Sequence, residues 1–238
     1  MPSFFLSLFL IETNQKLMKN KDILIRIWPF FVVFFIYLFI GLALIQYYGR
    51  DNLQLIINKY HTPFWDKFFQ IYTELGTTGF FIILIIYIVW KSNWLMLLYL
   101  TLTELFAGVT NLGIKKLFFE NVYRPSYYFY QKNIPIHLPK GEGLTMSYTF
   151  PSGHTLVAVV ITITLCLLTK NRWLQLLFSF QFISIAYSRM YLSKHFMIDT
   201  LGGSVFALFT YIFVYYLLNQ ERTHFLDRPI RKSNVSRN

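Results

Sequence analysis

The sequence predicts an all-α, polytopic membrane protein, a bundle of six transmembrane helices. Two observations point to this fold class. Hydrophobic residues make up 55% of the 238 residues and charged residues only 14%, whereas soluble domains carry about 25% charged residues. The polar side chains are therefore too few to coat a water-soluble globule. The chain also contains long apolar runs separated by polar breaks, which is the pattern of helices that cross a bilayer repeatedly.

Composition excludes several other classes of protein. The single cysteine, Cys166, rules out an internal disulfide framework and any cysteine-based zinc cluster. The net charge of +11 is compatible with nucleic-acid binding, but the basic residues lie between the apolar runs. This placement favours a membrane protein with membrane lipids as its surroundings and no nucleic-acid partner.

Six apolar runs are long enough to span a hydrocarbon core, which requires about 20 residues. The first contains no charged residue, the second carries Glu74 near its start, and the third carries Glu104. A long polar and aromatic stretch, residues 115–152, separates the third run from the fourth. The six predicted spans are residues 27–48, 71–90, 94–114, 153–169, 173–191 and 196–218.

The distribution of lysine and arginine predicts the orientation. Six crossings put both termini on one side, and that side carries 12 basic residues. The other side carries 10, of which four fall in the clusters described below. Because loops rich in lysine and arginine remain in the cytoplasm, we predict cytoplasmic termini. The outward loops are then residues 49–70, 115–152 and 192–195.

The chain is accordingly divided into a cytoplasmic N-terminal segment (1–26), a six-helix membrane domain (27–218) and a basic cytoplasmic tail (219–238). The apolar residues near the extreme N-terminus are too few to cross a bilayer and lack the basic flank of a signal peptide. A start at Met18, followed by basic residues, is more natural, so we expect residues 1–17 to be dispensable.

The first cluster of chemical interest is Pro151-Ser152-Gly153-His154, at the start of the fourth run. Proline and serine are helix-start residues, so Ser152 is predicted to be an N-cap. The free N–H groups of a helix N-terminus bind anions, and Gly153 allows an anion to approach the backbone closely. His154 then lies in the first turn, within reach of the bound group. The alternative is a capped helix with an incidental histidine.

The second cluster is Ser188-Arg189 followed by His195 and Asp199. His195 and Asp199 are four residues apart and so share a helical face. A carboxylate beside an imidazole fixes its tautomer and supports its cationic form. The other ring nitrogen is then free to act as a covalent nucleophile. The alternative is a surface His–Asp pair, but an acid one turn into an apolar run is costly without a function.

The third cluster, Lys115 and Lys116 with Arg124-Pro125, follows the third run. Basic residues at the end of a membrane helix are commonly anchors whose side chains snorkel to the interface. This cluster therefore indicates a functional site only because it lies on the same side of the membrane as the other two. Together the clusters supply several cationic donors, a helix N-terminus and two histidines. That set suits phosphoryl transfer, which depends on positioning and on stabilising charge over the phosphoryl oxygens. Arginine binds phosphate bidentately through its planar fork.

Two of these clusters resemble signature motifs of a known family, the type 2 phosphatidic acid phosphatase superfamily. Its members include membrane lipid phosphatases, glucose-6-phosphatase, bacterial acid phosphatases and vanadium haloperoxidases. The resemblance covers residues 60 to 218. The motifs that match completely are Pro151-Ser152-Gly153-His154 and Ser188-Arg189-x5-His195-x3-Asp199.

The first motif of the family is met only in part. The family usually has lysine, six residues and then Arg-Pro, whereas seven residues separate Lys116 from Arg124 and eight separate Lys115 from it. Leu117 occupies the usual lysine position, and Ser126 stands where a second arginine is common. Either lysine is therefore a candidate for the phosphate contact, with Lys115 slightly favoured.

The resemblance implies a role for each matching residue. His195 attacks phosphorus and forms a phosphohistidine, while Asp199 orients the ring and stabilises its charge. His154 protonates the leaving oxygen and then activates water. Neither a metal nor a cofactor is implied, because cationic side chains take the part of a metal ion. The implied phosphate-binding residues are Lys115 or Lys116, Arg124, Ser152, Gly153 and Arg189.

The implied function is hydrolysis of a lipid phosphate monoester or pyrophosphate by an enzyme of the bacterial inner membrane. A site at the outer membrane interface, facing the periplasm or exterior, suits a substrate whose tails stay in lipid. Undecaprenyl pyrophosphate, phosphatidic acid, phosphatidylglycerol phosphate and lipid A phosphate all satisfy this. A lipid phosphotransferase using the same residues is an alternative. Two further alternatives, a six-helix transporter and a non-catalytic lipid-binding protein, fit less well because the charges gather at one face and the motifs are intact.

Three expectations concern other polar residues. Glu74 and Glu104 could face the site or a polar groove between helices, but we expect neutral, helix-packed carboxyls rather than catalytic groups. His61 and His137 are expected to be exposed loop residues without a role. The tyrosine- and phenylalanine-rich stretch 126–150 is either an amphipathic cover over the site at headgroup level or an ordinary interfacial loop.

Overall fold

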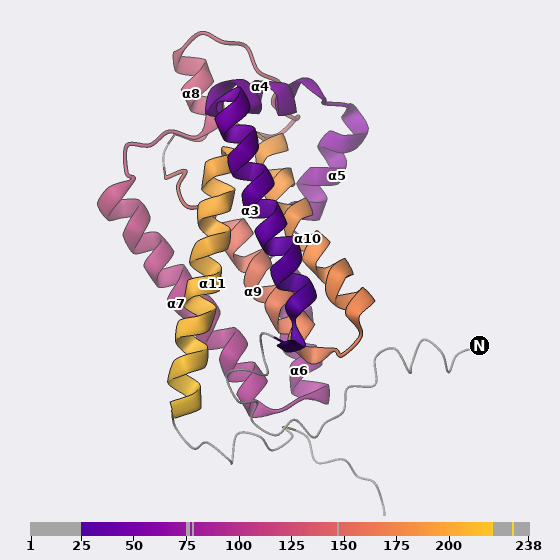
Figure 1. Cartoon of the computed structure of the whole chain (residues 1–238). Helices are drawn as coiled ribbons and strands as arrows, with labels where there is room; N and C mark the ends of the chain where they lie inside the picture. Colours follow the sequence, from indigo (N-terminus) through magenta and orange to yellow (C-terminus); the bar gives the residue numbers. More distant parts are fainter. Residues whose placement is uncertain (1–24, 75–76, 78, 147, 221–229, 231–238) are drawn as a thin grey trace, which may run out of the picture.

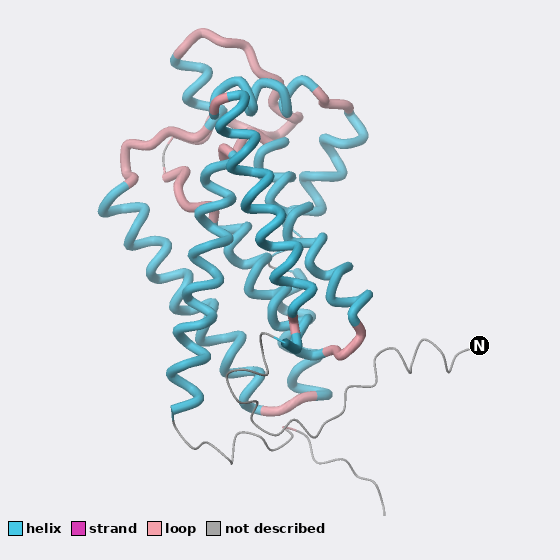
Figure 2. The backbone as a smooth tube through the Cα atoms, viewed as in Figure 1, coloured by secondary structure: helices cyan, strands magenta, loops and turns pink. Residues whose placement is uncertain are grey.

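The computed structural model describes residues 25–74, 77, 79–146, 148–220 and 230. These residues form helices and connecting loops, and the described part of the chain contains no β-strand. The predictions for residues 1–17 and for nearly all of the basic tail fall outside the described residues. The long helices run side by side as a bundle, with loops gathered at its two ends (Figures 1 and 2).

Five of the six predicted spans each coincide with one helix. These are α3 (Trp28–Tyr48), α7 (Trp94–Phe118), α9 (Gly153–Leu168), α10 (Arg172–Tyr191) and α11 (Met197–Gln220). By length and composition, three described helices are able to cross a membrane, namely α3, α7 and the Met197–Leu218 part of α11. Two shorter apolar helices accompany them, α9 and the Phe80–Trp90 part of α6.

The second predicted span differs from the others because its described middle residues, Thr77 and Gly79, have π-helical rather than α-helical geometry. Residues 71–90 are divided between α5 (Pro63–Glu74) and α6 (Phe80–Lys91). The sequence between them contains two glycines and two threonines, residue types that weaken a helix. The hydroxyl of Thr77 donates hydrogen bonds to the carbonyl oxygens of Thr73 (3.0 Å) and Glu74 (3.3 Å). Hydrogen bonds from a threonine hydroxyl to the carbonyls three and four residues back are typical of threonine within a helix.

Helix α9 forms the centre of the bundle and packs against α10, α11 and α7 (Figure 1). Its sequence is apolar on every face, as expected of a helix surrounded by others. The fully buried side chains that surround it include Leu100, Phe182 and Ile185. Because α9 begins with the first cluster, its central position puts His154 among the ends of the neighbouring helices.

The polar breaks at one end of the bundle are helix caps. The side-chain oxygen of Asn171 accepts hydrogen bonds from the N–H groups of Trp173 (2.9 Å) and Leu174 (3.3 Å) at the start of α10. Asn93 caps α7 in the same way through the N–H of Met96 (3.0 Å). Asparagine is among the strongest N-cap residues, so these turns are encoded locally.

The opposite end of the bundle is built from short helices and longer loops. It carries α4 (Arg50–Lys59), the beginning of α5 and α8 (Pro125–Gln131) (Figure 1). The start of α9, the ends of α7 and α10 and the start of α11 lie at this end as well. The three sequence clusters therefore converge on one end of the molecule.

Candidate active site

His195 lies between α10 and α11, and its side chain is only 2% exposed. Its Nδ1 atom is 3.6 Å from the Asp199 Oδ2 atom and 3.4 Å from the Thr149 hydroxyl. The same Asp199 oxygen accepts hydrogen bonds from the Thr149 hydroxyl (2.5 Å) and from the N–H of Phe196 (2.8 Å). The carboxylate is thus fixed against one ring nitrogen, and the other ring nitrogen remains for chemistry.

The predicted proximity of His195 and Asp199 is present, but they do not share a helical face. Helix α11 begins only at Met197, so His195 precedes it. The two side chains meet because the backbone after His195 turns into the helix and donates its N–H to the carboxylate, in the manner of an N-terminal cap.

The surroundings of His195 favour its neutral form. Burial lowers the pKa of His195 well below its ordinary value, and the positive charges of Arg124, Arg189 and Lys115 lower it further. Both effects disfavour the imidazolium. The unprotonated ring has a free lone pair, which is the state that a nucleophilic histidine requires.

Cationic side chains from three segments gather around this ring. Arg189, at the end of α10, is buried, and its Nη1 atom donates a hydrogen bond to the Thr73 hydroxyl (3.1 Å). The Nε atom of Arg189 is buried without a hydrogen-bond partner in the described structure. Arg124, just before α8, is half-buried and acts electrostatically on both histidines. An arginine donor left open inside a cationic cluster is suited to an anion.

The two candidate lysines differ in their surroundings. Lys115 is half-buried and interacts electrostatically with Arg124, Arg189 and Asp199. Lys116 is exposed. Consecutive residues on a helix point about 100° apart, so only one of them faces the cluster. The structure brings Lys115 to the other site residues.

Ser152 is the N-cap of α9, as predicted, but its side chain makes no capping hydrogen bond. Its hydroxyl oxygen instead accepts a hydrogen bond from the Thr155 hydroxyl (3.1 Å). At Gly153, a Cβ atom would lie 3.1 Å from the amide nitrogen of Asn111. The start of α9 is therefore closely packed, with its first N–H groups available to an anion.

Two glycines allow the start of α9 to pack against α11. The N–H of Ser152 donates to the carbonyl oxygen of Asp199 (2.9 Å). A Cβ atom on Gly203 would lie 2.5 Å from the carbonyl oxygen of Ser152, and one on Gly202 would overlap the ring of Phe150. Since real Cβ atoms do not approach so closely, only glycine permits this contact between the two histidine-bearing segments.

His154 lies in the first turn of α9 and is partly open to solvent. Its side chain is 33% exposed, and its Nε2 atom is 3.4 Å from the Oε1 atom of Glu74. The expectation of a helix-packed carboxyl at Glu74 is wrong, because this side chain is 67% exposed at the end of α5. Glu104 fits that expectation, since its Oε1 atom is buried within the bundle without a hydrogen-bond partner in the described structure.

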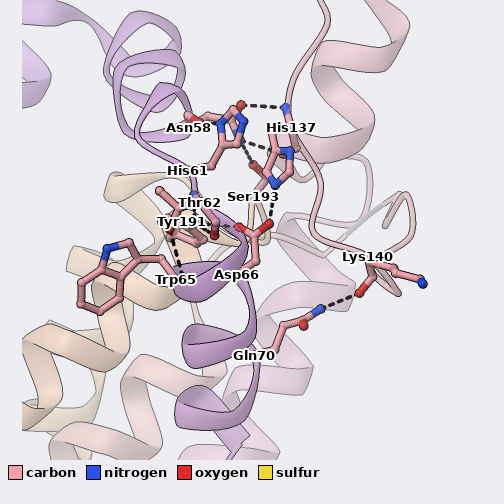
Figure 3. Close-up of polar contacts among 10 residues, drawn as sticks. All are labelled: Asn58, His61, Thr62, Trp65, Asp66, Gln70, His137, Lys140, Tyr191 and Ser193. Atoms are coloured by element: carbon pink, nitrogen blue, oxygen red, sulfur yellow. Dashed lines mark hydrogen bonds and ion pairs between the residues drawn. The ribbon is translucent and has the colours of Figure 1, made fainter.

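A polar cluster at the rim joins α4 and α5 to the loop after α8 and to the end of α10 (Figure 3). The His137 Nε2 atom is 2.7 Å from Asp66 Oδ2, and the Tyr191 hydroxyl donates to Asp66 Oδ1 (2.6 Å). The His61 ring stacks on the His137 ring with centroids 3.8 Å apart. Asn58 pairs with both the N–H and the carbonyl of His137 (2.8 Å each). The expectation that both histidines are exposed is wrong for His137, which is half-buried.

A second set of contacts holds α8 on α4. The Asp51 carboxylate accepts hydrogen bonds from the Tyr128 hydroxyl (2.5 Å) and from Arg50 Nε (2.9 Å). Burial of Asp51 opposes its ionisation, but these hydrogen bonds outweigh burial and lower its pKa. The Arg50 guanidinium also lies over the ring of Phe196, 4.3 Å from its centroid, which is a cation–π geometry. The stretch 126–150 is therefore packed onto the site end, and its Thr149 contacts the His195–Asp199 pair.

Thr73 and Thr149 were not predicted as part of this arrangement, and for Glu74 a place at the site was only the less favoured alternative. None belongs to a motif, and each reaches the site through a contact between distant parts of the chain. At positions 73 and 74, the available signal was a threonine followed by an acid beside an apolar run. Such a polar pair could have pointed to a contact with the site. The structure brings together the predicted residues His154, His195, Asp199, Arg124, Arg189, Ser152, Gly153 and Lys115.

An apolar helical bundle of this kind is typical of a membrane protein, and the histidines, carboxylate and cations gathered at one end have the chemistry to bind an anionic group. The chain belongs to the PAP2 superfamily, whose family pattern matches residues 92–223. The resemblance predicted from the motifs is thereby confirmed.

The chain is also similar to individual proteins. It is 36% identical over 56 residues to an undecaprenyl-diphosphatase of Sulfolobus acidocaldarius, a match that covers 24% of this chain and 27% of that relative. The match thus spans about a quarter of that curated relative.

Two crystal structures share the fold. LpxE of Aquifex aeolicus has a TM-score of 0.54 and 23% identity, covering 69% of this chain and 93% of that one. The PAP2-type phosphatidylglycerolphosphate phosphatase of Bacillus subtilis has a TM-score of 0.53 and 22% identity, covering 81% of this chain and 98% of that one. At these identities the likeness supports the fold.

Proposed function

We propose that the protein is an integral membrane phosphatase that hydrolyses a lipid phosphate monoester or diphosphate through a phosphohistidine, without a metal ion. The observation that carries this proposal is the buried His195 ring, with Asp199 against its Nδ1 atom and Arg124, Arg189 and Lys115 acting on it. Membership of the PAP2 superfamily supports the same reaction class.

In the first step, the Nε2 lone pair of His195 attacks phosphorus and the bond between phosphorus and the leaving oxygen breaks. The ring becomes cationic, and the Asp199 carboxylate stabilises that charge while holding the Nδ1 proton. Protonated His154 gives its proton to the leaving oxygen. Arg189, Arg124 and the N–H groups at the start of α9 stabilise the charge on the remaining phosphoryl oxygens.

In the second step, neutral His154 accepts a proton from water as the water oxygen attacks the phosphohistidine. The bond between phosphorus and Nε2 breaks, inorganic phosphate leaves, and His195 returns to its neutral form. The proton on His154 is restored, so the cycle is balanced. The partial exposure of His154 is consistent with this exchange with water.

The proposed substrate is a phosphorylated lipid whose tails remain in the bilayer while its phosphate enters the cationic end of the bundle. The similar proteins carry names that refer to undecaprenyl diphosphate and phosphatidylglycerol phosphate, and both compounds fit this description, as do phosphatidic acid and lipid A phosphate. We further propose a multi-pass inner-membrane protein with cytoplasmic termini and an outward-facing site, in which α5 and α6 together form the second crossing.

The test is phosphate release from a panel of these lipid phosphates in detergent with EDTA present. We expect activity in EDTA and loss of activity in His195→Ala and His154→Ala. His61→Ala is the matched control, because His61 is an exposed rim histidine, and it should retain activity. Activity that survives His195→Ala would overturn the mechanism, and activity abolished by EDTA would overturn its metal independence.

A further inference from the structure

We propose that Glu74 is the carboxylate partner of His154, a positioning residue that holds the imidazole and favours its protonated form. This inference rests on the reaction proposed above. It assigns to the acid–base histidine a partner equivalent to the one that Asp199 provides for His195. No sequence motif contains Glu74, which approaches the site from α5.

Two adjacent residues at the end of α5, Thr73 and Glu74, each contact a different residue of the site. Thr73 accepts a hydrogen bond from Arg189 Nη1 (3.1 Å) and is buried. Its neighbour Glu74 places Oε1 3.4 Å from His154 Nε2. Because Thr73 fixes the rotation of the helix end, Glu74 is directed toward the start of α9.

Helix α5 is itself anchored on α10, the helix that carries Arg189. The Tyr191 hydroxyl donates to Asp66 (2.6 Å) and accepts from the N–H of Thr62 (3.2 Å), contacts that Figure 3 shows. One turn further along, Phe69 is buried against the Tyr191 ring, with centroids 4.7 Å apart. The position of Glu74 relative to His154 is therefore set by a packed interface, although the carboxylate itself is exposed.

The charges around His154 explain why a carboxylate is useful there. Burial opposes a proton on His154 most strongly, and Arg189 from α10 and Arg124 from the segment before α8 add to that opposition, whereas Glu74 from α5 favours the proton. His195 lies in the same cluster, and burial and the nearby cations favour its neutral form. A general acid close to two guanidinium groups loses its proton at a lower pH unless a nearby anion offsets their positive charge. Among the groups that act on His154 in the described structure, Glu74 supplies that negative charge.

The decisive experiment compares Glu74→Gln with wild type on two substrates across a range of pH. One substrate is a lipid phosphate monoester, whose alkoxide leaving group needs a proton. The other is a short-chain aryl phosphate, whose leaving group departs without one. We expect Glu74→Gln to reduce kcat roughly 5- to 10-fold for the lipid phosphate, with little change for the aryl phosphate.

The pH profile provides a second readout. The Glu74 carboxylate stabilises protonated His154, so without it the proton leaves at lower pH. The basic limb of kcat/KM should therefore move to lower pH in Glu74→Gln and return part of the way in Glu74→Asp. The matched control is Glu120→Gln, which removes an exposed acid after α7 and should leave both the rates and the profile unchanged.

Each outcome is informative. Rates and profiles of Glu74→Gln that coincide with wild type would overturn the inference. An equal loss on both substrates without movement of the basic limb would do so too, because it would indicate a structural role alone. If wild type released no phosphate, or His195→Ala remained active, the proposed function itself would fail. Loss in His195→Ala beside an unaltered Glu74→Gln would remove only the role of Glu74.

Discussion

The His195 half of the site and the His154 half differ in how far they are removed from water. The side chains of His195 and Asp199 are 2% and 3% exposed, whereas those of His154 and Glu74 are 33% and 67% exposed. The first pair is fixed by hydrogen bonds from Thr149 and the backbone. The second pair lies at the solvent-exposed C-terminal end of α5.

This difference matches the tasks proposed for the two histidines. A nucleophile benefits from a fixed, dry position, because charge interactions are strong where water is excluded. An acid–base group must exchange its proton with water in every cycle and so needs access to solvent. We therefore expect both histidines to be required, and replacement of the buried carboxylate partner to have a larger effect than replacement of the exposed one.

The largest contrast is expected between the two carboxylates. Asp199→Asn should reduce kcat by roughly a thousand-fold or more, because an amide neither stabilises the cationic ring nor holds its tautomer. Glu74→Gln should cost about ten-fold at most, since exposed ion pairs are weak. Initial rates of phosphate release measure both. Equal losses in the two variants would contradict the proposed difference between the buried and the exposed carboxylate.

The next contrast lies between the adjacent lysines. Lys115→Ala should lower kcat/KM by roughly 10- to 100-fold, because a half-buried charge beside Arg124 and Arg189 is lost. Lys116→Ala should stay within about two-fold, as is usual for an exposed side chain. Rates at sub-saturating lipid phosphate separate the two variants. The reverse ranking would assign the phosphate contact to Lys116.

Much of the site was predictable because its residues are close in sequence. The segments 151–154 and 188–199 each carry their own geometry, through a helix start in one case and a tight turn into a helix in the other. Glu74 and His154 are 80 residues apart, and Thr149 and Asp199 are 50 apart, so their contacts depend on packing that a single sequence does not reveal.

In the fold, too, locally encoded features were predictable and features that depend on packing were not. The asparagine caps at 93 and 171 mark helix starts that can be read directly from the sequence. The π-helical geometry of Thr77 and Gly79, between α5 and α6, was not predicted, because composition alone does not distinguish it from a regular α-helix. The choice between Lys115 and Lys116 likewise depends on the rotation of α7 in the bundle.

A stability effect tests how the two halves are joined. Gly203→Ala places a Cβ atom 2.5 Å from the Ser152 carbonyl oxygen, so the backbone must shift. We expect a loss of about 1–3 kcal/mol in the free energy of unfolding and reduced activity. Gly108→Ala is the matched control, since nothing lies within 4 Å of its Cβ position. Equal thermal midpoints for both variants in detergent would contradict the close contact.

The smallest effect concerns the acid limb of the pH profile. Burial and nearby cations lower the pKa of His195, so the ring stays neutral as pH falls below its ordinary pKa of about 6.5. The acid limb of kcat/KM should therefore lie below about pH 6.5 in a bell-shaped profile, with His154 governing the basic limb. A flat profile between about pH 5 and 8, with chemistry rate-limiting, would contradict this assignment.

The most direct test of the account is chemical detection of the phosphoenzyme. His154→Ala in detergent is mixed with an aryl phosphate, whose cleavage needs no acid, and is quenched under alkaline conditions that preserve phosphohistidine. Peptide mass spectrometry should find phosphate on His195, accumulated because no base activates water, and should find none in His195→Ala. Phosphate on another residue, or substrate turnover with no phosphoenzyme at any time point, would contradict the central claim.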